Sequence, residues 1–247
     1  MKRFSLVLAA TLAVPAAHAL PLLSIYGGAY SIQSETSGKV AAGAANIDLE
    51  DDLGFGDRAS QQVLFVGLEH AVPLVPNARL RWMSLSDNAS TTLDNSVTFK
   101  DTTFAEGTQL RSSVDMDMVD ATAYYSFLSN PISLNVGLSL RQLDAEVSLR
   151  DADTRSRERG SAVFPLGHAR VGVQFPFTGF YGDAEVNAIS FDGSRISDVT
   201  ARLGWRSEYL LGVELGYSDV RVKLDDVGGL DTDLTMNGPF IGLSLQF

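Results

Sequence analysis

Two acidic segments contain the side chains best suited to hold a metal ion. One lies in the first quarter of the chain and the other near its end, and their carboxylates are Asp48, Glu50, Asp51, Asp52, Asp225, Asp226, Asp231 and Asp233. Carboxylate oxygens are typical Ca²⁺ ligands. Neither segment has the fixed carboxylate positions and closing glutamate of an EF-hand loop. We therefore expect solvated acidic loops without a cofactor. The alternative is calcium binding, or bridging to lipopolysaccharide through divalent ions.

Histidine, the most common general base, is scarce in this chain. There are three histidines, and only His70 and His168 lie beyond the first 19 residues. A hydrolase or acyltransferase needs a base beside its nucleophile. The chain also has no cysteine, which excludes a disulfide scaffold and a thiolate metal site. The sequence thus predicts a protein that is not an enzyme and names no catalytic residue, with a hydrolase or acyltransferase as the alternative.

A third set of polar residues alternates with apolar ones along the chain. It consists of the arginines Arg79, Arg81, Arg141, Arg170, Arg202 and Arg206 and the carboxylates Glu69, Asp183, Glu185, Asp198 and Glu214. Successive side chains of a strand point to opposite faces, so these charges share one face of a sheet. Because the two signs nearly cancel, we expect an ion-pair network. Arg202 should meet Asp183 and Glu185 across a hairpin.

Alternation of this kind extends through most of the chain and predicts β-strands. The clearest runs are 131–142, 168–175, 180–188, 198–206, 211–218 and 241–247. After Gln142 the pattern shifts by one residue, with Leu143, Ala145 and Val147 on the apolar positions. A β-bulge produces such a shift. We therefore predict a bulge at this point.

The connections between these runs alternate in length. Short turns are expected near 73–77, 129–131, 176–179 and 207–209, and the other connections at 33–60, 87–109, 151–160, 192–194 and 225–232. Short turns on one side and longer loops on the other are typical of outer-membrane barrels. The sequence predicts an all-β fold, an antiparallel transmembrane β-barrel of about ten strands. Eight or twelve strands remain open, because 87–109 could hold another hairpin.

The N-terminus has the pattern of a secretory signal peptide. Lys2 and Arg3 precede an apolar stretch, which ends in Ala17-His18-Ala19. We expect a signal peptide over 1–19 and an outer-membrane β-barrel over 20–247. Loss of two basic residues leaves 19 − 2 = 17 against 30 acidic ones, a net charge of 17 − 30 = −13. Such a charge disfavours nucleic acid as a partner.

Three features favour the outer membrane over a periplasmic β domain, which is the alternative. The signal directs export, aromatic residues cluster near the short turns, and the last strand ends in Phe247. A terminal strand that ends in phenylalanine resembles the assembly signal of outer-membrane barrels. The expected partners are therefore outer-membrane lipid, lipopolysaccharide and the barrel assembly machinery.

Several short motifs spread over the chain resemble one family of proteins. They are 25–30, which contains Gly27-Gly28, together with 47–54, 68–74, 176–179 and 224–243. On these stretches the chain resembles the GlyGly-type outer membrane proteins, uncharacterised Gram-negative β-barrels of about this length. The resemblance implies the location and the fold, and it implies no activity and no site residues.

The number of strands bears on function. Barrels of about eight strands have an interior just filled by side chains, whereas open porin channels need about 16–18. A paired, neutral interior in about ten strands predicts a plug. We expect a structural or surface-interaction role through the outer loops, for an external ligand that the sequence does not identify. A narrow passive channel for small solutes or ions is the alternative.

Overall fold

The protein folds as a closed β-barrel. The computed structural model describes residues 23–247 except 43–44, 57, 129–130 and 228–229, so the expected signal peptide at 1–19 lies outside the described residues. The barrel strands are β1 (Leu23–Ala42), β3 (Ala59–His70), β4 (Asn77–Thr92), β7 (Gln109–Leu128), β8 (Ile132–Arg150), β9 (Arg155–Gln174), β10 (Phe180–Phe191), β11 (Ser194–Arg206), β12 (Leu211–Val227) and β13 (Leu230–Gln246).

The sheet closes between its first and last strands. Each barrel strand pairs antiparallel with its neighbours, and β13 pairs with β1 from Tyr26↔Gln246 to Ala42↔Leu230. Ten strands therefore form the ring, as predicted. Segment 87–109 adds no strand to the ring; it contains the separate hairpin of β5 (Val97–Phe99) and β6 (Thr102–Phe104). Among the described residues no helix is long and apolar enough to cross a membrane.

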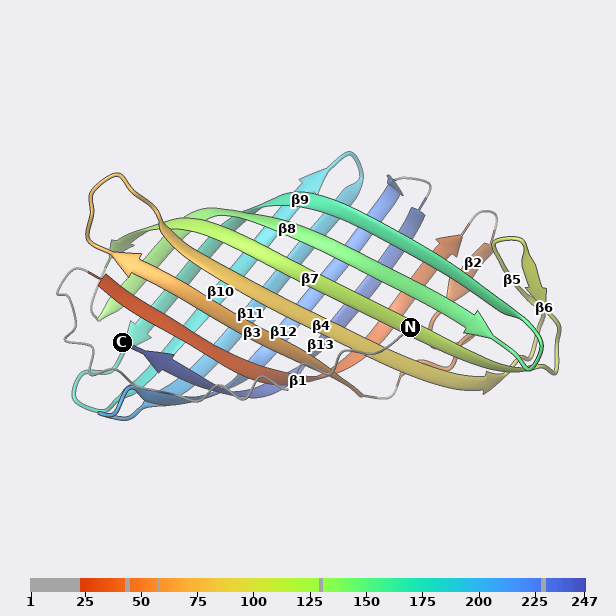
Figure 1. The fold of residues 1–247 in the computed structure, drawn as a ribbon, viewed down its shortest axis with the longest axis horizontal. Coiled ribbons are helices and arrows are strands. Elements are labelled where there is room, and N and C mark those ends of the chain that lie inside the picture. The colour runs from red at the N-terminus through yellow and green to blue at the C-terminus, as the bar shows by residue number, and fades with distance from the viewer. Residues whose placement is uncertain (1–22, 43–44, 57, 129–130, 228–229) are drawn as a thin grey trace.

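The two ends of the barrel differ. The predicted short turns near 73–77, 176–179 and 207–209 lie at one end, which we call the turn side and which also holds the C-terminus (Figure 1). The turn predicted near 129–131 falls on residues 129–130, which lie outside the described residues. The opposite loop side holds β5, β6 and β2 (Ala45–Asp48), which pairs with β1. The strands reach further toward the loop side than predicted. For example, β1 continues through segment 33–42 and β9 begins at Arg155, which shortens the expected loops 33–60 and 151–160.

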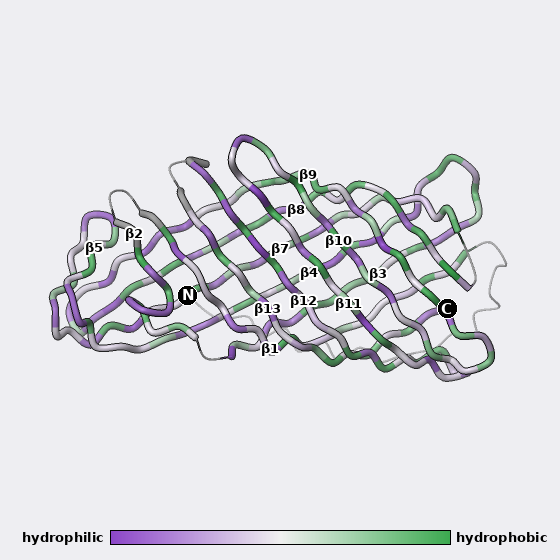
Figure 2. The backbone as a smooth tube through the Cα atoms, turned by 180° about the vertical axis from the view of Figure 1, so that it is seen from behind, coloured by the Kyte–Doolittle hydropathy of each residue, from purple (hydrophilic) through white to green (hydrophobic). Residues whose placement is uncertain are grey.

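The polarity of the two strand faces is exchanged part of the way along the barrel, as β8 shows. On β8, Val136, Leu138 and Leu140 face outward and are exposed, whereas further along Gln142 and Asp144 occupy the outward positions. The predicted bulge after Gln142 is wrong, because β8 keeps an unbroken register there with both β7 and β9. The pattern shifts because the outer surface changes from apolar to polar while the backbone alternation continues. Figure 2 shows the corresponding hydrophobic and hydrophilic stretches along the strands.

The turn-side part of the barrel has the surface of a membrane-spanning segment. Its outer face is an apolar belt with exposed aromatic residues at both margins: Tyr125, Phe127, Phe175, Phe180, Trp205 and Tyr209 near the turns, and Trp82 and Tyr217 toward the loops. Aromatic girdles on both sides of an apolar band are characteristic of transmembrane β-barrels. Closure also leaves no sheet edge in the hydrocarbon. The protein is thus an integral β-barrel of the outer membrane.

The loop-side part extends beyond this belt and has an apolar interior. Buried residues of the strands, such as Ile32, Leu85 and Met116, pack there with residues of the loops. The first loop contributes Leu49 and Phe55, and the β5–β6 hairpin contributes its own phenylalanines. This part resembles a water-soluble barrel, with its polar face outside. Below it, the lumen of the membrane-spanning part is polar.

Candidate functional site

A cluster of buried ion pairs fills the lumen at the level of the apolar belt. At its centre, Asp120 of β7 accepts hydrogen bonds from Arg81 Nη2 at 2.5 Å and from Arg141 Nε at 2.7 Å. The same two arginines also bind Asp198 of β11, with Arg141 Nη2 at 2.7 Å from Asp198 Oδ2. The side chains of all four residues are at most 4% exposed. Each charge is thus compensated at least twice in a site with little water.

Several of these contacts cross the barrel. In the ring of ten strands, β4 and β11 lie on opposite sides, and Arg81 of β4 binds Asp198 of β11. Arg79, also on β4, donates two hydrogen bonds to Glu185 of β10, one of them 2.7 Å long. These side chains therefore span the interior from wall to wall and close it. We call this set, together with Asp120 and Arg141, the lumenal layer.

A second group of charges lies next to this layer, toward the turn side. Arg202 stands directly opposite Asp183 in the β10–β11 hairpin, and its Nε lies 2.9 Å from Asp183 Oδ1. Its Nη2 is 3.3 Å from Glu185, and its Nη1 is 3.7 Å from Glu214. Arg170 binds Asp183 at 2.9 Å. The hairpin thus brings Arg202 to the two carboxylates expected from the sequence.

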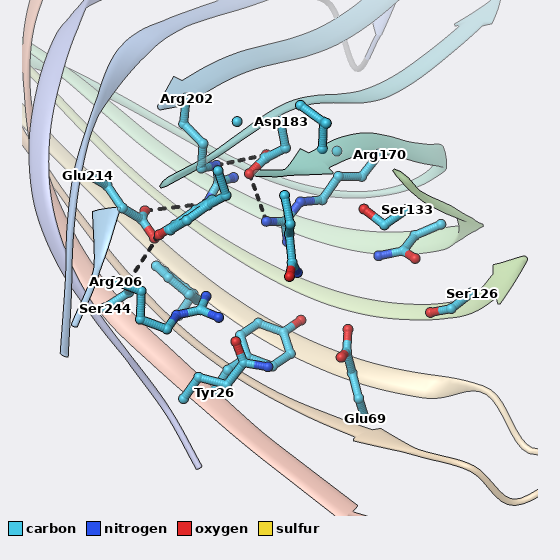
Figure 3. Close-up of a pocket in the computed structure, with 18 of the residues that line it drawn as sticks. Tyr26, Glu69, Ser126, Ser133, Arg170, Asp183, Arg202, Arg206, Glu214 and Ser244 are labelled. Carbon is cyan, nitrogen blue, oxygen red and sulfur yellow. Dashed lines mark hydrogen bonds and ion pairs between the residues drawn. The ribbon is translucent and has the colours of Figure 1, made fainter. Parts of the chain in front are cut away.

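The turn-side mouth of the lumen is a polar cavity of about 240 Å³ (Figure 3). Two of the expected network residues line it without an ion pair. Glu69 accepts a hydrogen bond from the Tyr124 hydroxyl at 2.8 Å, and the Arg206 guanidinium lies 5.0 Å from the ring centre of Tyr181. No carboxylate of the described residues lies within 4 Å of Arg206. Arg206 is therefore separate from the lumenal layer.

The sequence-based set missed Asp120, the carboxylate that joins two arginines. It follows Met116 and Met118 on the inward positions of β7, so its face looks apolar until that residue. The sequence pattern that could have revealed Asp120 is an unbroken alternation along β7 in which the inward face changes from apolar to polar. With Asp120 included, six arginines and six carboxylates point into the lumen and the mouth. Also missed was Asn187, which binds His168 Nδ1 at 2.8 Å.

The acidic loop residues are spread over local turns. Asp48 accepts hydrogen bonds from the N–H groups of Glu50 and Asp51 and lies 3.6 Å from Lys39, while Asp52 accepts one from the N–H group of Asp48. In the last loop, the side chains of Asp226 and Asp231 lie outside the described residues, and Asp225 and Asp233 lie on β12 and β13. Within the part of the chain that the structure describes, no three acidic or histidine side chains are grouped to hold a metal ion.

The C-terminal residue takes part in closing the ring. The N–H group of Phe247 donates to the Ile25 carbonyl at 2.7 Å, and the N–H group of Ile25 donates to the Phe247 carbonyl at 3.1 Å. Ser24 Oγ adds a hydrogen bond to the same carbonyl at 3.0 Å. These contacts continue the register of β13 with β1 and close the barrel that the sequence predicts.

No protein-family model matches this sequence, and no curated protein sequence matches it either. Among solved structures it is similar to the outer membrane protease OmpT from Escherichia coli, with a TM-score of 0.55, 9% identity, and coverage of 91% of this chain and 97% of that one. The translocator domain of autotransporter NalP from Neisseria meningitidis has a TM-score of 0.45, 11% identity, and coverage of 94% and 90%. The similarity to OmpT shows a shared fold, that of a closed outer-membrane β-barrel.

Proposed function

We propose that this protein is a non-conducting surface protein of the outer membrane, which acts through the part of the barrel that extends beyond the bilayer. The observation that carries the proposal is closure of the lumen at two levels. The lumenal layer spans the interior within the belt, and an apolar core fills it on the loop side. A channel for ions or polar solutes, the alternative expected from the sequence, would need a continuous polar path through both levels.

We further propose that the protein is not an enzyme. Its two described histidines lie away from the loops. His168 is buried in the lumen between Asn187 and the Tyr124 ring, and His70 ends β3 on the turn side, where its Nδ1 accepts the N–H group of Val72. The proposed partners within the envelope are outer-membrane lipid and lipopolysaccharide around the belt, and the assembly machinery that recognises the last strand.

Conductance across planar lipid bilayers tests the closed lumen. The wild-type protein should give no current steps, and addition of a porin afterwards verifies that the bilayer reports channels. The double variant Arg79→Ser, Glu185→Ser removes both ends of one contact across the lumen without changing its net charge. Because the apolar core still closes the loop side, this variant should also give no steps. Steady steps from the wild-type protein would contradict the proposal.

A further inference from the structure

Strand β9 has a free edge over its loop-side half. On one side β8 pairs with β9 throughout, from Ile132↔Val173 to Arg150↔Arg155. On the other side β10 pairs only with residues 167–174, since the last pair is Ala188↔Gly167. Among the described residues, no strand pairs with this second edge over 155–166. The ring is therefore complete in the membrane and incomplete above it.

The register shows which backbone groups the edge presents. The N–H group of Phe175 donates to Phe180 of β10, whereas the N–H group of Gln174 donates to the β8 side. Because the two directions alternate in an antiparallel ladder, the odd residues of β9 point to the β10 side. Pro165 would be the next residue to pair with β10, and it has no N–H group to donate. The ladder ends there. Among the described residues no strand pairs with the backbone donors and acceptors of the odd residues from Arg155 to Val163.

The free edge stands in a step of the barrel wall outside the hydrocarbon. The β10–β11 hairpin turns at Asp192–Gly193, while β9 continues for twelve residues beyond its last pair with β10 (Figure 1). The outward residues of this stretch are polar from Arg155 to Ser161, the part that lies furthest from the apolar belt. An unpaired backbone edge is excluded from lipid but is tolerated in water, where it can accept an added strand.

The outer face beside this edge is unusually basic for an acidic protein. Arg155, Arg157 and Arg159 point outward from β9, and Arg155 lies in one row with Arg150 and Arg111 on the next two strands. Glu146 is shared by Arg157 and Arg159, at 2.9 and 2.8 Å. Like charges directly opposite each other are destabilising in an antiparallel pair. Carboxylates on an added strand would reduce the repulsion between the arginines of this row.

The inner face beside the edge is apolar only toward the turn side. Nearer the loops, Ser156, Glu158 and Gly160 hold the inward positions, and Glu158 pairs with Lys100. Ala162, Phe164 and Leu166 point inward from β9, and the Phe164 ring lies 6.3 Å from the ring of Phe191 at the end of β10. Phe191 remains 37% exposed at this step. At its turn-side end, an added strand would thus place every second side chain against apolar groups, and further along it would place the alternate ones beside the arginines.

We propose that the free edge of β9 over residues 155–163 binds an extended peptide segment of a partner protein, in which acidic residues alternate with apolar ones. The segment pairs with the backbone of the odd residues, turns its carboxylates toward the arginines and fills the step above the β10–β11 hairpin. Strand addition of this kind takes its affinity from main-chain hydrogen bonds and its specificity from alternate side chains. The proposal rests on the surface-interaction role proposed above and names the chemistry of its partner.

The test uses the folded full-length protein in lipid nanodiscs and a fluorescent nine-residue peptide of alternating glutamate and valine. A second peptide has the same sequence with an N-methyl group on every second residue, which removes the donors of one edge and keeps the charges. A third has the same composition with the residues in blocks. Fluorescence anisotropy should show binding of the first peptide, and binding at least roughly tenfold weaker of the other two, because several hydrogen bonds are lost.

Two variants locate the site on the protein. Ser161→Pro removes one N–H donor from the free edge and should weaken binding about tenfold. The strand should tolerate this proline, because Pro165 already occupies an equivalent odd position of β9. Ser161→Ala keeps that donor and should bind like the wild-type protein. Equal binding of the first peptide by wild type and Ser161→Pro would overturn the proposal. Equal binding of the first and the N-methylated peptide by the wild-type protein would also overturn it, and that comparison does not depend on the folding of any variant.

The natural absence of cysteine allows one further measurement. With copper–phenanthroline and air as the oxidant, Arg159→Cys should form a disulfide with a cysteine-bearing peptide of the alternating sequence. Without peptide, Arg159→Cys is compared with the control Gln142→Cys for dimer formation. If Arg159→Cys formed disulfide-linked dimers much faster than Gln142→Cys, the edge would bind a second copy of this chain, and the peptide proposal would be overturned. If the wild-type barrel does not conduct and also does not bind the peptide, only this inference is refuted. If the wild-type barrel conducts, the proposed function is refuted.

Discussion

Asp120 has the most consequential side chain of the lumen, because it compensates two arginines at once. Arg81 and Arg141 both donate to it, and both then extend to Asp198. A buried guanidinium is tolerated only when its charge is paired and its hydrogen bonds are made. The carboxylate therefore keeps two cations in the interior.

Asp120→Asn should destabilise the barrel by about 3–5 kcal/mol, since it leaves buried positive charge uncompensated. Asp117→Asn is the matched control on the same strand. Asp117 points outward and faces Asp144 across the β7–β8 pair, so loss of its charge should cost nothing and relieve repulsion. Reversible urea unfolding in lipid vesicles measures both free energies. Equal values for the two variants would show that the lumenal layer contributes no stability.

Strand β8 shows what the sequence predicted and where its interpretation failed. Alternation predicted the strands, because a period of two is independent of surroundings. The lengths of the connections predicted the turns and the barrel. It did not tell which surroundings each face meets. The exchange of apolar and polar faces near Gln142 therefore resembled a bulge, and the same exchange concealed Asp120 on β7. Contacts across the lumen depend on the ring as a whole, so only adjacent pairs such as Arg202 and Asp183 could be predicted.

Two outward positions of β8 test this exchange. Val136→Arg places a charge in the apolar belt and should cost about 2–4 kcal/mol near the bilayer midplane. Gln142→Arg lies on the same face of the strand but above the belt, and its cost should be within about 0.5 kcal/mol. Unfolding in lipid vesicles again supplies both values. If Gln142→Arg were the more damaging, Gln142 would face the interior and the bulge interpretation would return.

The β5–β6 hairpin closes the loop side through two buried rings. Phe99 and Phe104 are each 1% exposed, and Ser156 of β9 donates to the Phe99 carbonyl at 3.4 Å. Phe99→Ala should cost about 3–5 kcal/mol of local stability, because it leaves a cavity in the apolar core. Thr98→Ala, on the exposed face of the same strand, is the control. Hydrogen exchange of residues 93–108 should accelerate for Phe99→Ala alone, and unchanged exchange would exclude a closing role for this hairpin.

At the scale of the whole molecule, two kinds of barrel are joined end to end. In the membrane, apolar side chains face lipid, and six arginines and six carboxylates balance inside. Beyond it, polar side chains face water and apolar ones form the core. Both parts use the same ring, so the closure between β13 and β1 stabilises each of them. The interruption of the wall beside β9 lies where water can solvate a free edge.

Phe247 connects this closure with assembly in the cell. Its backbone makes two hydrogen bonds with Ile25, and its exposed ring lies at the turn-side end of the belt. Deletion of Phe247 should lower the stability of the purified barrel only modestly, since the remaining pairs of β13 with β1 persist. Assembly in cells should fall far more, because the deletion removes the residue that resembles an assembly signal.

Phe247→Ala keeps the backbone bonds and separates the two effects: it should match wild type in unfolding experiments and match the deletion in cells. The measurement is the amount of protease-resistant protein in isolated outer membranes. Normal amounts for Phe247→Ala would show that closure by the backbone suffices and that the ring has no part in assembly.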